Sequence, residues 1–172
     1  MTWKTHLGWT ERLSLPENTL TGMKNLLDAD FQDFQSAEVK YVLVGGYSVI
    51  LHGYSRTTGD LDIWVERTAA NYTRLTQAFH SFGMPVFDMT SQNFLHNPAL
   101  DVFTFGRPPV AIDIITQLKG MNFVEAYAKA SDIEVSGVTI RLIDYQHLLQ
   151  AKRAAGRPRD QNDLDNLLKG RK

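Results

Sequence analysis

Three aspartates interrupt apolar stretches of this sequence in a way that could place carboxylates around a metal ion. Asp60 and Asp62 lie in DLDIWV, and Asp113 lies in VAIDII. Side chains on a strand alternate between its two faces, so Asp60 and Asp62 point one way while Leu61 and Ile63 point into the core. Two neighbouring carboxylates repel each other, and a divalent cation between them removes that cost. The spacing therefore indicates a metal site.

Mg²⁺ is the cation that suits so small a set of ligands, because it prefers carboxylates together with substrate phosphates to a complete protein cage. If the strands that carry Asp62 and Asp113 are neighbours, three carboxylates converge. Such a set can hold two metal ions roughly 3.5 to 4 Å apart, which clamp the attacking and leaving oxygens of a phosphoryl displacement. The alternative for the Asp-Leu-Asp motif alone is a solvated strand end or turn.

A glycine pair ahead of the aspartates adds the chemistry of a phosphate site. Gly45 and Gly46 lie between the apolar stretch KYVLV and a short apolar helix. Glycine lets a phosphate approach backbone N–H groups and the positive end of a helix. Ser48, in the first turn of that helix, adds a hydroxyl donor. A plain tight turn is the alternative for the glycines by themselves, and their combination with the aspartates favours phosphate binding.

The glycine pair at 45–46, a thirteen-residue spacer, DLDI at 60–63 and IDI at 112–114 together resemble the signature of the DNA polymerase β superfamily of nucleotidyltransferases. The resemblance covers residues 40 to 115. It implies transfer of a nucleoside monophosphate from a nucleoside triphosphate to an acceptor, with release of pyrophosphate. It also implies Mg²⁺ as the cofactor, Asp60, Asp62 and Asp113 as its ligands, and Gly45, Gly46 and Ser48 as nucleotide contacts.

The stretch SRTTGDLD further resembles the branch of this superfamily that contains abortive-infection and toxin-like enzymes of toxin–antitoxin systems. That resemblance implies a place near the nucleotide for Arg56. The alternative is a surface arginine in a turn.

The two C-terminal helices each carry one charged residue on an apolar face, Lys152 on the first and Asp160 on the second. The apolar positions are Tyr145, Leu148 and Leu149 on the first helix and Leu164, Leu167 and Leu168 on the second. Lys152 could donate to a triphosphate, and Asp160 could orient Lys152 or deprotonate an acceptor hydroxyl. Alternatively, Lys152 reaches past its neighbours to water, and Asp160 favours a positive helix N-terminus. KRAAGRPRDQNDLDNL also resembles the closing motif of the toxin-like enzymes, with Arg159 where lysine is common.

Apolar periodicity and turn residues predict the elements that must position these side chains. Strands are expected at 40–44 and 61–65, on either side of a turn at 106–109, and on either side of a turn at 136–137. Helices are expected at 16–35, between the glycine pair and Gly53, and at 68–83, 122–130, 144–156 and 158–170. The fold class is therefore α+β, a mixed and largely antiparallel sheet with packed helices. Residues 1–15 are expected to form an arm, and residues 144–172 a C-terminal helical extension.

Length and charge describe one domain without an overall nucleic-acid signature. A chain of 172 residues, of which 43% are hydrophobic, is long enough for one core and too short for two ordinary domains. From residue 150 onward there are 7 Lys/Arg and 3 Asp/Glu, a net of +4, which leaves 11 against 16, or −5, before it. The basic tail could meet a polyphosphate or RNA, although a solvated helix face gives the same pattern.

Several classes of site are excluded or disfavoured by composition. The absence of cysteine excludes disulfides and thiolate zinc sites. The five histidines show no metal-binding spacing. Trp64 and Tyr47 are expected in the core rather than against a nucleobase. No signal peptide or membrane span is visible, so a cytoplasmic protein without a membrane partner is expected.

The sequence therefore predicts a Mg²⁺-dependent nucleotidyltransferase of minimal size. The acceptor is left open between an RNA end such as that of tRNA, a partner protein and a small hydroxylated molecule. A different class of function is a non-catalytic antitoxin-like or RNA-binding module with the same fold, and a costly acidic cluster argues against it. A metal-dependent phosphohydrolase would differ only in using water as the acceptor.

Overall fold

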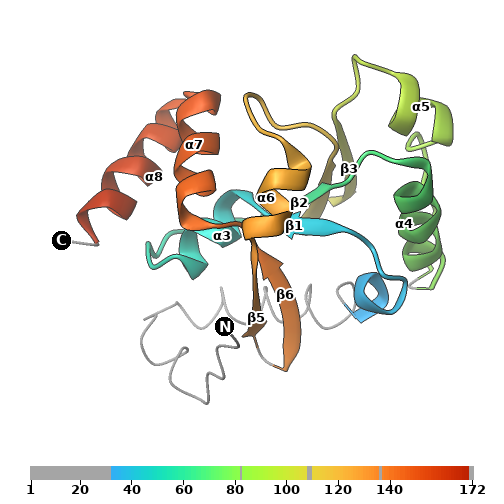
Figure 1. The fold of residues 1–172 in the computed structure, drawn as a ribbon, viewed down its shortest axis with the longest axis horizontal. Coiled ribbons are helices and arrows are strands. Elements are labelled where there is room, and N and C mark those ends of the chain that lie inside the picture. The colour runs from blue at the N-terminus through green and yellow to red at the C-terminus, as the bar shows by residue number, and fades with distance from the viewer. Residues whose placement is uncertain (1–31, 82, 108–109, 136, 171–172) are drawn as a thin grey trace.

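The computed structural model describes residues 32–170 apart from positions 82, 108–109 and 136. They form one six-stranded sheet with helices on both sides (Figure 1). The expected arm over 1–15, and almost all of the expected helix over 16–35, lie outside the described residues. Residues 32–36 are helical and Phe34 is fully buried, in agreement with the end of that helix.

The elements follow the predicted order, with one addition. The strands are β1 (Tyr41–Leu43), β2 (Asp60–Val65), β3 (Val102–Arg107), β4 (Val110–Ile115), β5 (Ser131–Val135) and β6 (Val138–Leu142). The helices after residue 40 are α3 (Gly45–Leu51), α4 (Ala69–Ser81), α5 (Ser91–His96), α6 (Phe123–Lys129), α7 (Tyr145–Ala155) and α8 (Pro158–Lys169). Helix α5 was not expected, because six residues are too few to show an apolar period. Its sequence signal is the N-cap Thr90, whose hydroxyl accepts a hydrogen bond from the backbone of Asn93.

The sheet has the order β3-β4-β2-β1-β6-β5. Neighbours β3 and β4, β1 and β2, and β5 and β6 are antiparallel, whereas β2 pairs in parallel with β4 and β1 in parallel with β6. The prediction of a mixed, largely antiparallel sheet is confirmed. The parallel pair of β2 and β4 brings the two aspartate-bearing strands side by side.

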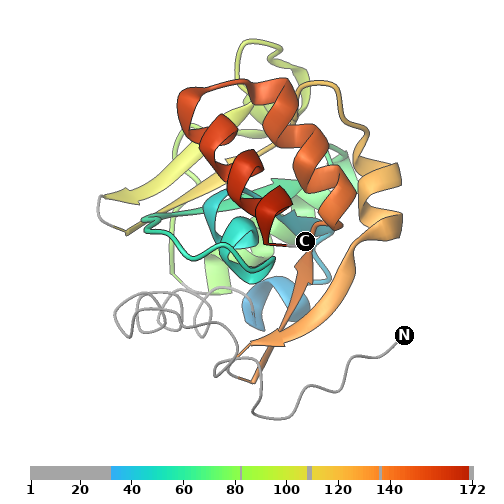
Figure 2. The same cartoon turned by 90° about the vertical axis from the view of Figure 1, so that its left-hand side faces the viewer.

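One face of the sheet is covered by α4 and α5 through aromatic contacts. The ring centroid of Phe105 on β3 lies 4.5 Å from that of Phe79 on α4, and the ring of Phe103 lies 6.4 Å from Phe94 on α5. Figure 1 shows α7 and α8 on the opposite side of the sheet from α4 and α5. Figure 2, viewed from that opposite side, shows α7 and α8 in front of the strands.

The face that carries the aspartates is partly closed by α6. Trp64, two residues beyond Asp62 on β2, is 1% exposed and meets the ring of Phe123 on α6 at 5.2 Å. Tyr47 on α3 is 3% exposed. Both aromatics belong to the core, as predicted. Helix α6 therefore covers the part of this face that lies next to Trp64.

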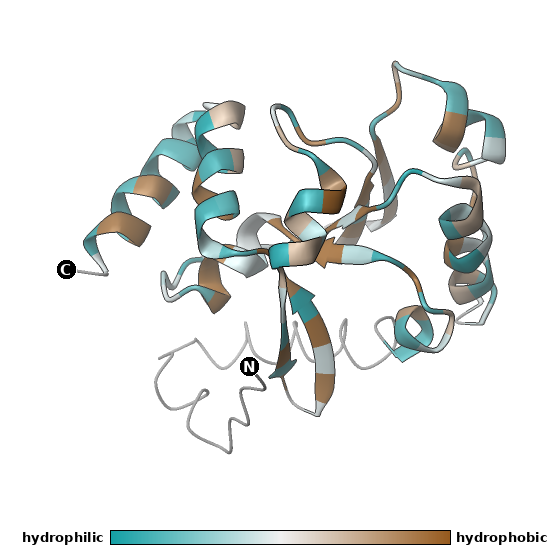
Figure 3. Ribbon diagram, viewed as in Figure 1, coloured by the Kyte–Doolittle hydropathy of each residue, from teal (hydrophilic) through white to brown (hydrophobic). Residues whose placement is uncertain are grey.

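Helix α8 packs through a face that differs slightly from the predicted one. Its buried residues are Asp160, Asp163, Leu164 and Leu167, which follow the helical period, whereas Leu168 is 44% exposed. The prediction that Leu168 faces inward was wrong, because it lies one residue beyond the stripe that Leu164 and Leu167 define. Figure 3 shows α4 and α8 each carrying hydrophobic and hydrophilic residues, as expected for helices with one face on the core. Within the described residues, no helix has the length and apolar character needed to span a bilayer.

Candidate active site

The three aspartates form an angled row on one face of two neighbouring strands. Asp62 on β2 is directly opposite Asp113 on β4, and Asp113 is opposite Thr104 on β3. Asp60 lies two residues before Asp62 and so shares its face of the sheet. The flanking Ile112 and Ile114 are buried on the other face. The strands that carry Asp62 and Asp113 are therefore neighbours, which is the condition that the predicted convergence of the three carboxylates requires.

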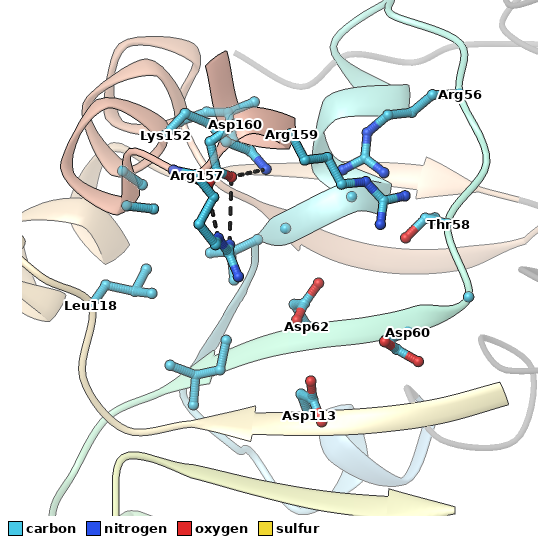
Figure 4. A pocket seen from close by; sticks show the side chains of 18 residues that line it. Arg56, Thr58, Asp60, Asp62, Asp113, Leu118, Lys152, Arg157, Arg159 and Asp160 are labelled. Carbon is cyan, nitrogen blue, oxygen red and sulfur yellow. Dashed lines mark hydrogen bonds and ion pairs between the residues drawn. The ribbon is translucent and has the colours of Figure 1, made fainter. Parts of the chain in front are cut away.

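A cleft of 310 Å³ opens over this row. Its floor carries the three aspartates and the glycine pair. Its opposite wall carries four cations, Arg56 from the loop before β2, Lys152 from α7, Arg157 from the turn between the helices, and Arg159 from α8 (Figure 4). The cleft therefore has an acidic side and a basic side that face each other, an arrangement that can hold a metal ion and a polyphosphate together.

Asp62 is the carboxyl whose ionisation the site disturbs most. Its pKa is raised from 3.8 to about 6, first by burial and then by repulsion from Asp113. A hydrogen bond from the backbone N–H of Gly46 lowers the pKa, the charge of Asp60 raises it, and the charge of Lys152 lowers it. Because the pKa is raised overall, the ionised form of Asp62 is unfavourable in the folded protein unless a cation lies beside it.

The donor set of this row fits Mg²⁺. All three groups are carboxylates, the hard oxygen ligands that Mg²⁺ prefers, and a cation among them would offset the repulsion that raises the pKa of Asp62. In the described part of the chain, no group of three or more His, Asp or Glu side chains is arranged to hold a metal ion by itself. Mg²⁺ usually completes its coordination with water and substrate phosphates, so such a cage is not required.

The glycine pair is required by the close approach of the chain to this row. Gly45 begins α3 with φ at +67°, and a Cβ built there would collide with Oδ2 of Asp62. A Cβ on Gly46 would collide with the hydroxyl of Thr58, and its third neighbour, a terminal nitrogen of Arg56, would lie 3.1 Å away. The two glycines thus allow the start of α3, the loop before β2 and the aspartate row to meet at one point.

Replacing Gly45 by alanine is expected to lower the free energy of unfolding by about 2 to 3 kcal/mol. About 1 to 2 kcal/mol of this comes from the left-handed backbone, and the rest from displacing the carboxylate of Asp62. Gly83→Ala is the matched control, since Gly83 has φ at +74° and open space around its Cβ position. Chemical denaturation measures both, and equal losses in the two variants would contradict the collision.

Ser48 differs from the other predicted nucleotide contacts. It is fully buried, and its hydroxyl donates to the carbonyl oxygen of Gly45 at 2.7 Å. It does not line the cleft. The structure therefore gives Ser48 a place behind the glycine turn, where its bond holds the carbonyl of Gly45.

Lys152, one of the four cations of the basic wall, is held by two aspartates of α8. Its side chain is buried, and its Nζ lies 3.1 Å from Oδ1 of Asp160 and 2.8 Å from Oδ2 of Asp163. The prediction that Asp160 can orient Lys152 matches this geometry. Burial alone would raise the pKa of Asp160, but hydrogen bonds from Arg157 and Lys152 outweigh it and the pKa is lowered. Asp160 is therefore a fixed anion beside the cleft.

Asp163 joins the basic wall to the loop before β2. Its carboxylate is fully buried, forms an ion pair with Arg56 in which Oδ1 lies 2.8 Å from Nε, and accepts a hydrogen bond through Oδ2 from a second guanidinium nitrogen of Arg56 at 3.1 Å. Two further bonds run from α8 to the same loop, from Arg159 to the carbonyl of Thr57 at 2.7 Å and from Asn162 to the hydroxyl of Tyr54 at 3.1 Å. The position of Arg56 at the cleft thus depends on α8.

Sequence reasoning missed three residues of this wall. Arg157 donates through Nε to Asp160 at 2.7 Å, with a side chain that is 75% exposed, and Arg159 reaches across to the loop. Asp163 follows Asp160 by three residues, so it lies on the same buried face of α8. The helical period could therefore have identified it from the sequence as a second charged residue among the apolar positions of that face. Arg157 carried no such signal, because exposed cations near a helix start are common, and Arg159 was noted only as the position where the closing motif of the toxin-like enzymes commonly has lysine.

Comparisons with known proteins show which solved structures share this fold. No protein-family model matches the sequence, and no curated protein matches it. Among solved structures, TM1012 of Thermotoga maritima, a protein for which nucleotidyltransferase activity has been suggested, superposes with a TM-score of 0.59 at 15% identity over 87% of this chain and 94% of that one. The lincosamide antibiotic adenylyltransferase LnuA, in a lincomycin-bound crystal structure, gives 0.52 at 17% identity over 89% and 96%. At these identities the likeness shows a shared fold.

Proposed function

We propose that this protein is a Mg²⁺-dependent nucleotidyltransferase that moves a nucleoside monophosphate from a nucleoside triphosphate to an acceptor hydroxyl. The observation that carries the proposal is the row of three aspartates facing a wall of four cations across a cleft of 310 Å³. A triphosphate with its metal ions carries both signs of charge, and so matches both walls. The shared fold with nucleotidyltransferase structures supports the same conclusion.

Each side of the cleft has its own part in the reaction. Asp60, Asp62 and Asp113 would hold Mg²⁺, which lowers the pKa of the acceptor hydroxyl and neutralises charge on the phosphate oxygens when bound. Lys152 and Arg157, fixed by Asp160, donate to the phosphate oxygens as negative charge builds on them. Gly45 and Gly46 keep the floor free of side chains, so that the phosphates can approach the backbone.

The acceptor is proposed from the same three classes that the sequence leaves open, namely an RNA end, a protein or a small hydroxylated molecule. LnuA, with its lincomycin-bound structure, supports the small-molecule class. Membership of the toxin-like branch rests on the SRTTGDLD stretch and on the C-terminal motif that contains Lys152 and Asp160. A non-catalytic module is less favoured, because it has no use for the raised pKa of Asp62.

A label-transfer experiment tests this function. The protein is incubated with Mg²⁺ and each of the four α-labelled nucleoside triphosphates, separately with total tRNA, cell protein and a small-molecule extract. We expect label on one acceptor class, abolished by EDTA and by an Asp60→Asn/Asp113→Asn variant. Release of inorganic phosphate without label transfer would favour the phosphohydrolase. Absence of both reactions, with no melting shift from any triphosphate with Mg²⁺, would exclude the enzyme.

A further inference from the structure

The aspartate row ends in a side chain that no motif includes. Thr104 lies on β3, the edge strand, directly opposite Asp113 on β4. Its hydroxyl Oγ1 lies 2.6 Å from Oδ1 of Asp113. A carboxylate has only acceptor oxygens, so the hydroxyl donates, and the distance is typical of a strong O–H to carboxylate bond.

This bond is the only hydrogen bond that the described residues supply to the side chain of Asp113. It occupies Oδ1 and leaves Oδ2 without a protein donor. Asp62, the neighbour of Asp113 in the row, is held by the backbone N–H of Gly46 instead. The two facing carboxylates are therefore each held by one donor, Asp62 by the first turn of α3 and Asp113 by β3.

We infer that Thr104 is a positioning residue for the metal site, acting through Asp113. This inference rests on the proposed function, since it assumes that Asp113 is a metal ligand. The hydroxyl fixes the rotation of the Asp113 carboxyl and leaves Oδ2 available to a divalent cation. Partners that hydrogen-bond to a ligating carboxylate typically contribute about 10- to 100-fold to metal affinity.

A simpler account of the same contact is a cross-strand polar pair that supports the pairing of β3 with β4. Such pairs contribute roughly 0.2 to 1 kcal/mol to a sheet. The two accounts differ in what they predict for Thr104→Val, which keeps the branched shape suited to a strand and removes only the hydroxyl. Loss of metal affinity with an unchanged metal-free protein supports positioning, whereas loss of stability with unchanged metal affinity supports pairing.

The test is a titration of the full chain with Mn²⁺ alone, followed by the electron paramagnetic resonance signal of free Mn²⁺. We expect Thr104→Val to raise the Kd for Mn²⁺ by about tenfold, and Thr104→Ser, which restores the donor, to stay within roughly twofold of the wild type. Thr139→Val, at an exposed position on β6, is the matched control and should leave the Kd unchanged. Transfer activity of Thr104→Val should recover its kcat at high Mg²⁺.

The outcomes separate this inference from the proposed function. If the wild type binds Mn²⁺ and Thr104→Val binds it equally well, Thr104 has no positioning role and the proposed function stands. If the wild type binds no Mn²⁺, the proposed function falls and the inference falls with it. A drop in the metal-free melting temperature of Thr104→Val beyond that of Thr139→Val, without a change in Kd, assigns the bond to strand pairing.

Discussion

Replacing Asp62 by asparagine is expected to abolish nucleotidyl transfer and, at neutral pH, to make the metal-free protein more stable. The variant loses the carboxylate at the centre of the row, between Asp60 and Asp113. If the metal site supplies about 4 kcal/mol of transition-state stabilisation, its loss slows the reaction about a thousandfold. Asparagine keeps the shape of the side chain and an oxygen for the N–H of Gly46, so the fold is retained.

The gain in stability depends on pH, and its sign follows from the direction of the pKa shift. The pKa of Asp62 is about 6 in the folded protein, against an ordinary value of 3.8. A raised carboxyl pKa means that the wild type loses stability as the pH rises from about 4 through about 6, since the folded state holds the proton more tightly. The loss is complete near pH 7 and amounts to at most about 3 kcal/mol for a shift of about two units.

Thermal unfolding of both proteins in EDTA between pH 4.5 and 7.5 measures this difference. We expect the melting temperature of Asp62→Asn to exceed that of the wild type by roughly 5 to 10 °C at pH 7, and the two to approach each other at pH 4.5. Asp88→Asn, at an exposed loop position, is the control for removing a negative charge. A variant that is less stable than the wild type at pH 7 would show that ionised Asp62 does not destabilise the folded protein.

Replacing Asp163 by asparagine is expected to destabilise the protein by about 3 kcal/mol. The change leaves the buried Lys152 and the partly buried Arg56 without the carboxylate that lies 2.8 Å from each of them. Breaking a buried ion pair by removing one partner typically costs about 3 to 5 kcal/mol, and Lys152 retains Asp160, which places the estimate at the lower end. Since Arg56 would lose the contacts that hold it at the cleft, the KM for the triphosphate should also rise.

Denaturant unfolding measures this effect, with Asp165→Asn as a control on the same helix. Asp165 is exposed and accepts one hydrogen bond, from Gln161 at 3.1 Å. Surface substitutions of this kind usually change stability by less than about 0.5 kcal/mol. Similar losses in the two variants would mean that the buried carboxylate does not join the loop to α8 in solution.

The part of the site that could be predicted from the sequence is the part with a local pattern. Asp60 and Asp62 share a face because of strand alternation, and Lys152 and Asp160 interrupt apolar stripes on helices. These patterns depend on residues within a few positions of each other. The fold class followed from the same signals, because the order of strands and helices can be read from periodicity and turn residues.

The rest depended on strand register and on contacts between distant segments. The sequence could state only that Asp113 would join Asp62 if their strands were neighbours, and the parallel pairing of β2 with β4 was needed to place them opposite each other. Thr104 entered the row only through the register of β3. The inward direction of the Ser48 hydroxyl was equally hidden, because a helix start offers a serine both a backbone carbonyl and a ligand.

The order of strands in the sheet also bears on how the chain can be made. The inner strand β1, at residues 41–43, lies between β2 and β6, and its second neighbour begins only at Val138. At about 5 to 20 residues per second, a ribosome needs roughly 5 to 20 seconds to supply that neighbour. During that interval the nascent chain presents an unpaired edge beside the buried residues Val42 and Leu43. An unpaired edge is a template for pairing with another chain, so we expect the nascent chain to be most prone to aggregation before β6 emerges.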